Sequence, residues 1–201
     1  DKGGEALELA RKAWQHSSAS WYDAEVLIDA LKGEGLAKES MSVFLEAARR
    51  LGSVNADMVV AAANAAKIAG ERDQEKAFLE EALGLPIDRP QILRRLIKYH
   101  IDLEQWTEAI AISRQLLTEV HGYRSDFTSL YSAANASNPN TGIDEARAWA
   151  LSASSNKEDT NYVAIEQLIS SGKNKRAEAL IENARIEYPD RFWPIYFWKQ
   201  A

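Results

Sequence analysis

The sequence contains no cysteine, and it has only five prolines and three histidines among 201 residues. Without cysteine the chain can form neither disulfide bonds nor thiolate sites, an absence compatible with a bacterial or periplasmic protein. The histidines, His16, His100 and His121, are too far apart in sequence for the short spacing of zinc-binding pairs. We therefore expect no metal ion and no cofactor, and we expect His100 to pack in a helix interface.

Long apolar runs and an excess of basic residues are also missing. No apolar segment approaches the roughly 18 residues that a membrane-spanning helix needs. The 24 Lys and Arg residues are outnumbered by 30 Asp and Glu residues, whereas a nucleic-acid-binding domain is normally basic. We therefore expect no direct insertion into a membrane and no nucleic-acid partner. No low-complexity tract marks a linker between domains.

Recognisable catalytic motifs are absent as well. The chain has neither the G-x-S-x-G pattern of serine hydrolases nor the H-E-x-x-H pattern of zinc peptidases. The adjacent carboxylates Glu80-Glu81 and Asp144-Glu145 fall on stretches expected to face solvent. The sequence therefore predicts a protein that is not an enzyme.

A short pattern recurs six times along the chain. It places a small residue, two apolar residues and another small residue at helical spacing, which is one face of an α-helix. Successive copies begin 34, 35, 34, 37 and 31 residues apart. The copies are Ala6, Leu9, Ala10, Ala13; Ser40, Val43, Phe44, Ala47; Glu75, Phe78, Leu79, Ala82; Ala109, Ile112, Ser113, Leu116; Ala146, Trp149, Ala150, Ala153; and Ala177, Leu180, Ile181, Ala184.

Another helix precedes each of these from the second copy on, so the unit is helix, turn, helix. The inner residues expected for these first helices are Leu27, Ile28, Leu31; Ala62, Ala63, Ala66; Leu96, Ile97, His100; Leu130, Tyr131, Ala134; and Ala164, Ile165, Leu168. Gly35, Gly70 and Gly172 mark turns, and Pro189 ends the last full copy. We expect one domain over residues 1–201, made of repeats at 21–55, 56–89, 90–123, 124–157 and 158–191, with partial repeats at 1–20 and 192–201. An insertion is expected in the polar turn 135–142, and a deletion near 156–158.

This pattern resembles the tetratricopeptide repeat family. The resemblance rests on the small residue that opens the second helix, the bulky apolar residue after it and the later alanine, together with Gly172 and Pro189. It implies an all-α fold, an α-solenoid of helix-turn-helix repeats that winds into a right-handed superhelix. In this family the first helices line a concave groove where ligands bind. Small side chains at the crossings also let helices approach to about 8–10 Å, which supports close stacking of neighbouring repeats.

The chain ends on the apolar segment 192–198. It fits the first helix of a further repeat, whereas a natural end cap would turn a polar face outward. Residues 1–20 likewise read as a second helix without a first. We therefore expect a piece of a longer array, whose apolar ends contact further repeats or a second copy. The alternative is a terminal helix that folds back on Leu180, Ile181 and Ala184.

The resemblance places a candidate binding groove on the outward residues of the first helices. These are Tyr22, Glu25, Asp29, Asn64, Lys67, Arg94, Arg95, Lys98, Tyr162 and Glu166. Arg94 and Lys98 lie one turn apart and form a basic centre with Lys67, which favours an acidic peptide because arginine binds carboxylates in a fork. The alternative is that these cations simply pair with Asp57 and Asp102 on the surface.

We therefore expect a non-catalytic scaffold whose groove binds a peptide or helix of a partner protein. One alternative is a periplasmic arm of a bacterial cell-envelope or exopolysaccharide export machine, in which Tyr22 and Tyr162 contact glycan. A regulatory segment of a larger enzyme is the third. The localisation stays open between cytoplasm and periplasm.

Overall fold

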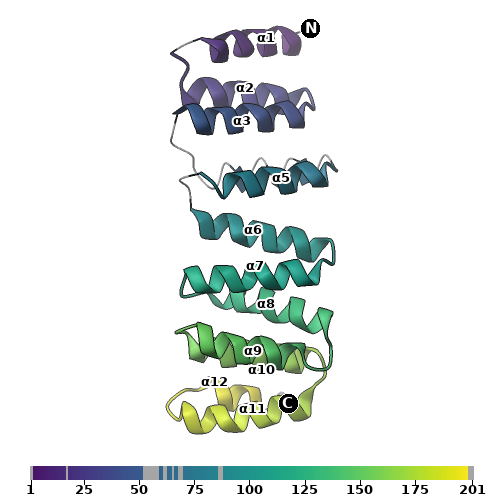
Figure 1. The fold of residues 1–201 in the computed structure, drawn as a ribbon, viewed down its shortest axis with the longest axis vertical. Coiled ribbons are helices and arrows are strands. Elements are labelled where there is room, and N and C mark those ends of the chain that lie inside the picture. The colour runs from purple at the N-terminus through teal and green to yellow at the C-terminus, as the bar shows by residue number, and fades with distance from the viewer. Residues whose placement is uncertain are drawn as a thin grey trace. The chain divides into compact units, whose positions relative to one another are not determined.

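The fold consists of helices only in the part of the chain that the structure describes (Figure 1). The structure is a computed structural model that describes residues 2–16, 18–51, 59–60, 63–64, 66–67, 70–85 and 88–198. Consecutive helices pack on one another within it. The prediction of an all-α protein is confirmed.

The chain forms two compact units, residues 1–96 and 97–201. The first contains α1 (Lys2–Gln15), α2 (Trp21–Gly33), α3 (Ala37–Leu51), α5 (Arg72–Ala82) and the start of α6 (Arg89–Asp102). The second contains the end of α6, α7 (Trp106–Glu119), α8 (Arg124–Ser137), α9 (Gly142–Ala153), α10 (Lys157–Ser170), α11 (Asn174–Glu187) and α12 (Trp193–Trp198). The described residues of 59–67 are helical too, where the first helix of the second repeat was expected.

Helix pairs occupy the positions that the repeat pattern predicts. In the first unit α2 packs on both α1 and α3. In the second unit α8 packs on α7, α9 and α10, and α10 packs on α9, α11 and α12. A helix in this arrangement buries its apolar face against neighbours in sequence, because no single pair could cover its own apolar surface.

Polar side chains join residues that are one repeat apart. Within the second unit, Arg124 binds Asp159 and Ser132 binds Gln167, each across 35 residues. His121 and Ser155 are 34 residues apart, as are Arg50 and the His16 carbonyl in the first unit. These separations of 34 and 35 residues equal the usual period of the apolar pattern, although the bonded residues are not members of that pattern. The packing therefore repeats with the same period as the sequence.

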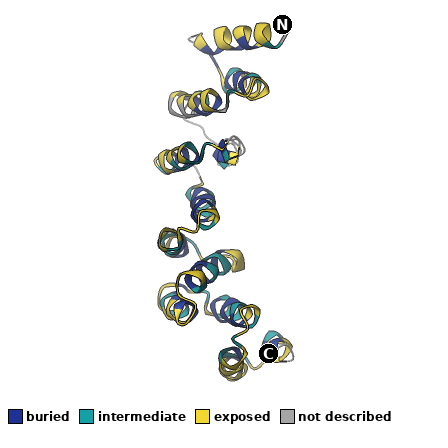
Figure 2. Ribbon diagram, turned by 90° about the vertical axis from the view of Figure 1, so that its right-hand side faces the viewer, coloured by how far each residue is buried: buried dark blue, intermediate teal, exposed yellow. Residues whose placement is uncertain are grey.

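Buried residues gather on one side of many of the helices, and exposed residues lie on the other side (Figure 2). All the inner residues expected for the first helices are buried, except Ala62, which lies outside the described residues. Alanines are prominent at these crossings, and Ala63, Ala66, Ala109, Ala164 and Ala177 are fully enclosed. A small side chain at a crossing lets two helix axes approach closely.

Helix α1 departs from the predicted pattern. Its buried residues are Leu7, Ala10 and Trp14, whereas Leu9, expected inside, is 67% exposed. Ala6 and Ala13, also expected inside, are exposed. The helix is rotated by about one residue because this register buries both Leu7 and the large indole of Trp14. The Arg50 guanidinium lies 5.0 Å from the centre of that indole and helps to hold it.

The insertion and the deletion in the repeat period both have a structural counterpart. The turn between α8 and α9 has four residues, 138–141, where the turns after α2, α6 and α10 have three. Gly142 follows it, and a Cβ there would lie 2.0 Å from the Ala134 carbonyl oxygen. Only glycine fits this close approach. Helix α9 has 12 residues against 14 in the second helices α7 and α11, and the turn after it, 154–156, is one residue shorter than the turn 120–123. The deletion therefore lies mainly in α9 and not at residues 156–158.

In the turns between the first and second helices of three repeats a glycine takes positive φ, but Glu104 takes that place between α6 and α7. Gly122, between α7 and α8, also has positive φ. Gly35, Gly70 and Gly172 have φ values of 73°, 77° and 73°, and Glu104 has φ 57°. It lies 34 residues after Gly70 and 68 before Gly172. A residue with a Cβ is strained in this left-handed region.

We predict that Glu104→Gly stabilises the protein by about 0.5–1 kcal/mol, since relief of this strain outweighs the greater freedom of glycine in the unfolded chain. The control is Glu34→Gly, at a glutamate in the α2–α3 turn with φ −88°, which should lower stability. Urea unfolding of both variants measures the difference. A lower midpoint for Glu104→Gly than for the parent would contradict the prediction.

Candidate functional site

The outward face of α2 carries three of the predicted groove residues. Tyr22 is 73% exposed, and Glu25 and Asp29 are exposed too. Asp29 accepts a hydrogen bond from the Lys32 Nζ at 3.3 Å, so its charge is partly balanced by its own helix. Glu25 and Tyr22 project from α2 without taking part in the core below. This face offers an aromatic ring beside a carboxylate.

The basic residues of the predicted centre have different surroundings. Lys98 is exposed on α6, whereas Arg94 on the same helix and Lys67 are half-buried. Lys67, Arg94 and Asp102 each have an interaction within the structure, and Asp57 lies outside the described residues. Asn64 is exposed. Arg94 and Lys98 are four residues apart in one helix, so their side chains project on the same side of α6.

Arg95, predicted to face the groove, is buried instead, with 8% of its side chain exposed. Its Nη2 donates to Glu75 Oε1 of α5 at 2.6 Å. Arg72 binds the other oxygen of the same carboxylate, Nη1 to Oε2, at 2.8 Å. Glu75 is fully buried, so its negative charge is satisfied by two guanidinium groups rather than by water. Arg95 is therefore a packing residue of the helix interface and not part of an exposed groove.

A signal for this ion pair was present in the sequence. Glu75 stands where the other copies carry Ser40, Ala109, Ala146 or Ala177, on the face that packs against other helices. A carboxylate buried there requires a cation within reach, because an unpaired buried charge is very costly. Arg95 is the residue that the neighbouring helix α6 supplies. The spacing of residues along α6 alone does not reveal that Arg95 pairs with Glu75.

Tyr162, predicted as an open aromatic surface, is covered by its neighbours. The Arg124 guanidinium of α8 lies 3.9 Å from the centre of its ring. Phe197 and Trp193 of α12 pack at 4.9 and 5.6 Å between ring centres. Tyr162 is thus half-buried and holds α8, α10 and α12 together, whereas Glu166 one turn later is exposed. The reading of Tyr162 as a free platform for a sugar ring is wrong.

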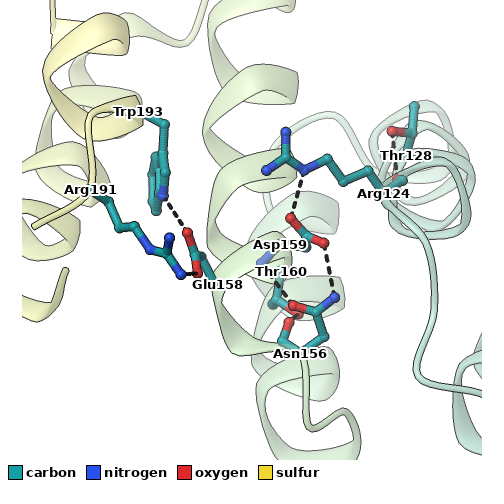
Figure 3. A network of polar contacts seen from close by, with 8 residues as sticks. All are labelled: Arg124, Thr128, Asn156, Glu158, Asp159, Thr160, Arg191 and Trp193. Carbon is teal, nitrogen blue, oxygen red and sulfur yellow. Dashed lines mark hydrogen bonds and ion pairs between the residues drawn. The ribbon is translucent and has the colours of Figure 1, made fainter.

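Charged residues link the N-terminal ends of α8, α10 and α12 beside this ring (Figure 3). Arg124 Nε donates to Asp159 Oδ1 at 2.6 Å, and this bond raises the pKa of Arg124. Glu158 accepts from Trp193 Nε1 at 2.9 Å and pairs with Arg191 at 3.0 Å. Asn156 caps α10 by accepting from the Asp159 amide at 3.2 Å. Adjacent carboxylates of one helix therefore point to two different neighbours.

His100 and His121 each contact a polar side chain. His100 is buried, and its Nδ1 lies 2.7 Å from Gln105 Oε1, as expected for a packed imidazole. His121 Nδ1 lies 2.7 Å from Ser155 Oγ on the surface. Among the described residues no group of three metal-ligating side chains occurs. In the same part of the chain, no helix is long and apolar enough to cross a membrane.

Three hollows of the described surface lie away from the predicted groove residues. One, of about 380 Å³, is lined by α1, α2 and α3 and includes Trp14 and Arg50. A second, of about 300 Å³, lies at the ends of α7 and α9 beside His121. A third, of about 280 Å³, lies between the end of α11 and the start of α12. None of these three is lined by the ten residues predicted for the groove.

We predict that Glu75→Ala destabilises the protein by about 3–5 kcal/mol, because it leaves the buried Arg95 charge without its partner. Adding Arg95→Leu should recover much of this loss, since the double variant buries no charge at this contact. Lys76→Ala, which breaks an exposed pair with Glu80, is the matched control and should change little. Thermal and urea unfolding of the parent and the three variants measures these differences in stability. A double variant less stable than Glu75→Ala alone would refute this account.

No protein-family model matches the chain, and no curated protein is similar to it in sequence at a meaningful level.

Proposed function

We propose that the chain is a non-catalytic binding scaffold of tetratricopeptide-like repeats. They form an α-solenoid that winds into a right-handed superhelix, and its first helices line a concave surface that binds a partner protein. The ligand is an extended peptide or a helix laid across that surface. Because a fold does not define a function, the proposal is based on the exposed residues of the first helices.

One observation carries the proposal: the first helices keep charged and aromatic groups exposed on the side away from their packing faces. Tyr22, Glu25, Lys98 and Glu166 are all exposed, while residues one or two positions away are buried in helix interfaces. Scattered surface charges need no explanation, but here exposed charged residues occur on the first helices of the first, third and fifth repeats. Such a series suits recognition of a long ligand by several repeats at once.

The basic residues of α6 favour an acidic ligand. Arg94 and Lys98 project on one side of that helix, and Arg94 is half-buried, which strengthens its charge interactions relative to bulk water. A carboxylate of the ligand can displace the present partner of Arg94, since a forked guanidinium binds carboxylates in two-point geometry. The overall charge of −6 makes a cationic site of this kind locally distinct.

We predict that Arg94→Glu with Lys98→Glu abolishes partner binding and leaves the helical content unchanged. The partner is captured from a lysate of the native cells by crosslinking, and its crosslinked segment is synthesised and titrated. The double variant should bind that segment about a hundredfold more weakly, because two charge-assisted contacts become repulsive.

The control is Lys12→Glu with Lys175→Glu, two exposed lysines on α1 and α11 that give the same change in net charge. Equal affinity of both double variants for the segment would rule out α6 as the binding element. Circular dichroism of each protein confirms that the fold is retained.

A second candidate function, contact with glycan, is favoured by Tyr22 alone. Its ring is exposed on α2, whereas Tyr162 is covered, so one platform of the predicted pair is accessible. We predict that Tyr22→Ala removes binding to a neutral exopolysaccharide in a retardation gel, and that Tyr22→Phe retains it, because stacking needs the ring and not the hydroxyl. Unaltered retardation of Tyr22→Ala would exclude this role.

A further inference from the structure

The exposed surface of the second unit is unusually apolar around α12. Ile186, Phe192, Ile195, Tyr196 and Trp198 are all large apolar residues with substantial exposure. Buried neighbours lie directly beneath, since Phe197 packs in one cluster with Ile165, Ile181 and Ala184. The exposed residues therefore extend an existing core to the surface. A concentration of this kind marks an interaction site more often than isolated surface residues do.

Helices α8, α10 and α12 are the first helices of this unit, and one face of α12 is more exposed than the same face of the other two. Ile195 and Trp198 are 47% and 49% exposed. The residues 34 positions earlier, Asn161 and Ala164 of α10, are buried. So are the residues 68 positions earlier, Phe127 and Leu130 of α8.

The apolar clusters show which helices share a core with these buried residues of α8 and α10. Phe127 and Leu130 belong to one apolar cluster with Ile143, Ala146 and Ala150 of α9. Ala164 belongs to the same cluster as Ala177 of α11. Helices that present alanine thus share a core with Phe127, Leu130 and Ala164. Asn161 lies outside that cluster, and its side chain bonds with Arg147 of α9 and with Tyr188.

The local shape also suits a helix. A hollow of about 280 Å³ adjoins the face and is lined by Ile186, Tyr188, Pro189 and Ile195 and by the charged residues Glu182, Arg185 and Arg191. The Arg185 guanidinium lies 5.4 Å from the centre of the Trp198 ring and holds the indole from one side. A side chain that projects from a covering helix can fill this hollow.

We propose that the face of α12 formed by Ile195 and Trp198 is a second docking site, separate from the first-helix surface. Its ligand is an amphipathic helix with the small–apolar–small pattern of α9 and α11. The bulk of Trp198, at a position held by leucine in α8 and alanine in α10, requires a small residue opposite it. The occupant is thus defined by its pattern and not by hydrophobicity alone.

The probe is a peptide of residues 174–187, stapled on its solvent side so that its helix is already formed. The full chain is labelled with 5-fluorotryptophan, and its fluorine spectrum is assigned with Trp198→Phe. The peptide should shift the Trp198 resonance in a saturable way and leave Trp14 unmoved. The matched control peptide carries Ala177→Leu and should bind about tenfold more weakly, because the larger side chain overpacks the crossing.

Protein variants complete the test. Ile195→Glu should abolish the shift, whereas Leu9→Glu, at an exposed leucine on α1, should not affect it. No shift with the parent peptide, or equal binding of both peptides, overturns the proposal. So does a Trp198 shift that follows protein concentration alone, with dimers in sedimentation, since a second copy would then cover this face.

Discussion

Each helix of this protein has one apolar stripe, and only neighbouring helices can cover it. That constraint explains why alanine is so frequent at the crossings. Ala63, Ala109, Ala164 and Ala177 are each completely enclosed, and a larger side chain at any of them would push two helices apart. Burial of the bulkier residues, among them Phe44, Phe127 and Tyr131, depends on that close approach. The stability of each repeat is consequently shared with the repeats on either side of it.

Charged residues adapt the same architecture where the apolar pattern changes. Glu75 replaces a small residue, and the arginines at 72 and 95 satisfy its carboxylate inside the interface. At the ends of α8, α10 and α12 the carboxylates Glu158 and Asp159 bind arginines on opposite sides. The first pair is enclosed and fixes a particular partner, because either charge alone would be costly to bury. The second group is partly exposed and adds little energy, but it sets which helix ends lie together.

Much of the fold could be predicted from the sequence, because spacing alone reports which residues of a helix face inward. The inner residues of the described first helices and the turn glycines were predicted correctly. The rotation of α1 was not, since both registers place alanine inside and only the fit of Trp14 decides between them. The candidate site was harder to predict. Whether Arg95 or Tyr162 is accessible depends on Glu75, Arg124 and Trp193, which approach from other helices, and periodicity along one helix contains no information about them.

Among the described residues, many of the side-chain hydrogen bonds that link different helices and their turns join residues 14 to 38 positions apart, from Arg147–Asn161 to Lys173–Asn135. Chain closure over such short segments costs little entropy, and proteins with local contacts fold quickly. Formation of one helix pair creates the surface on which the next can form, so folding can start at more than one place and spread along the chain. Opening follows the same logic in reverse. Amide hydrogen exchange in such a protein reports a series of local transitions, each involving one or two helix pairs, rather than a single global event.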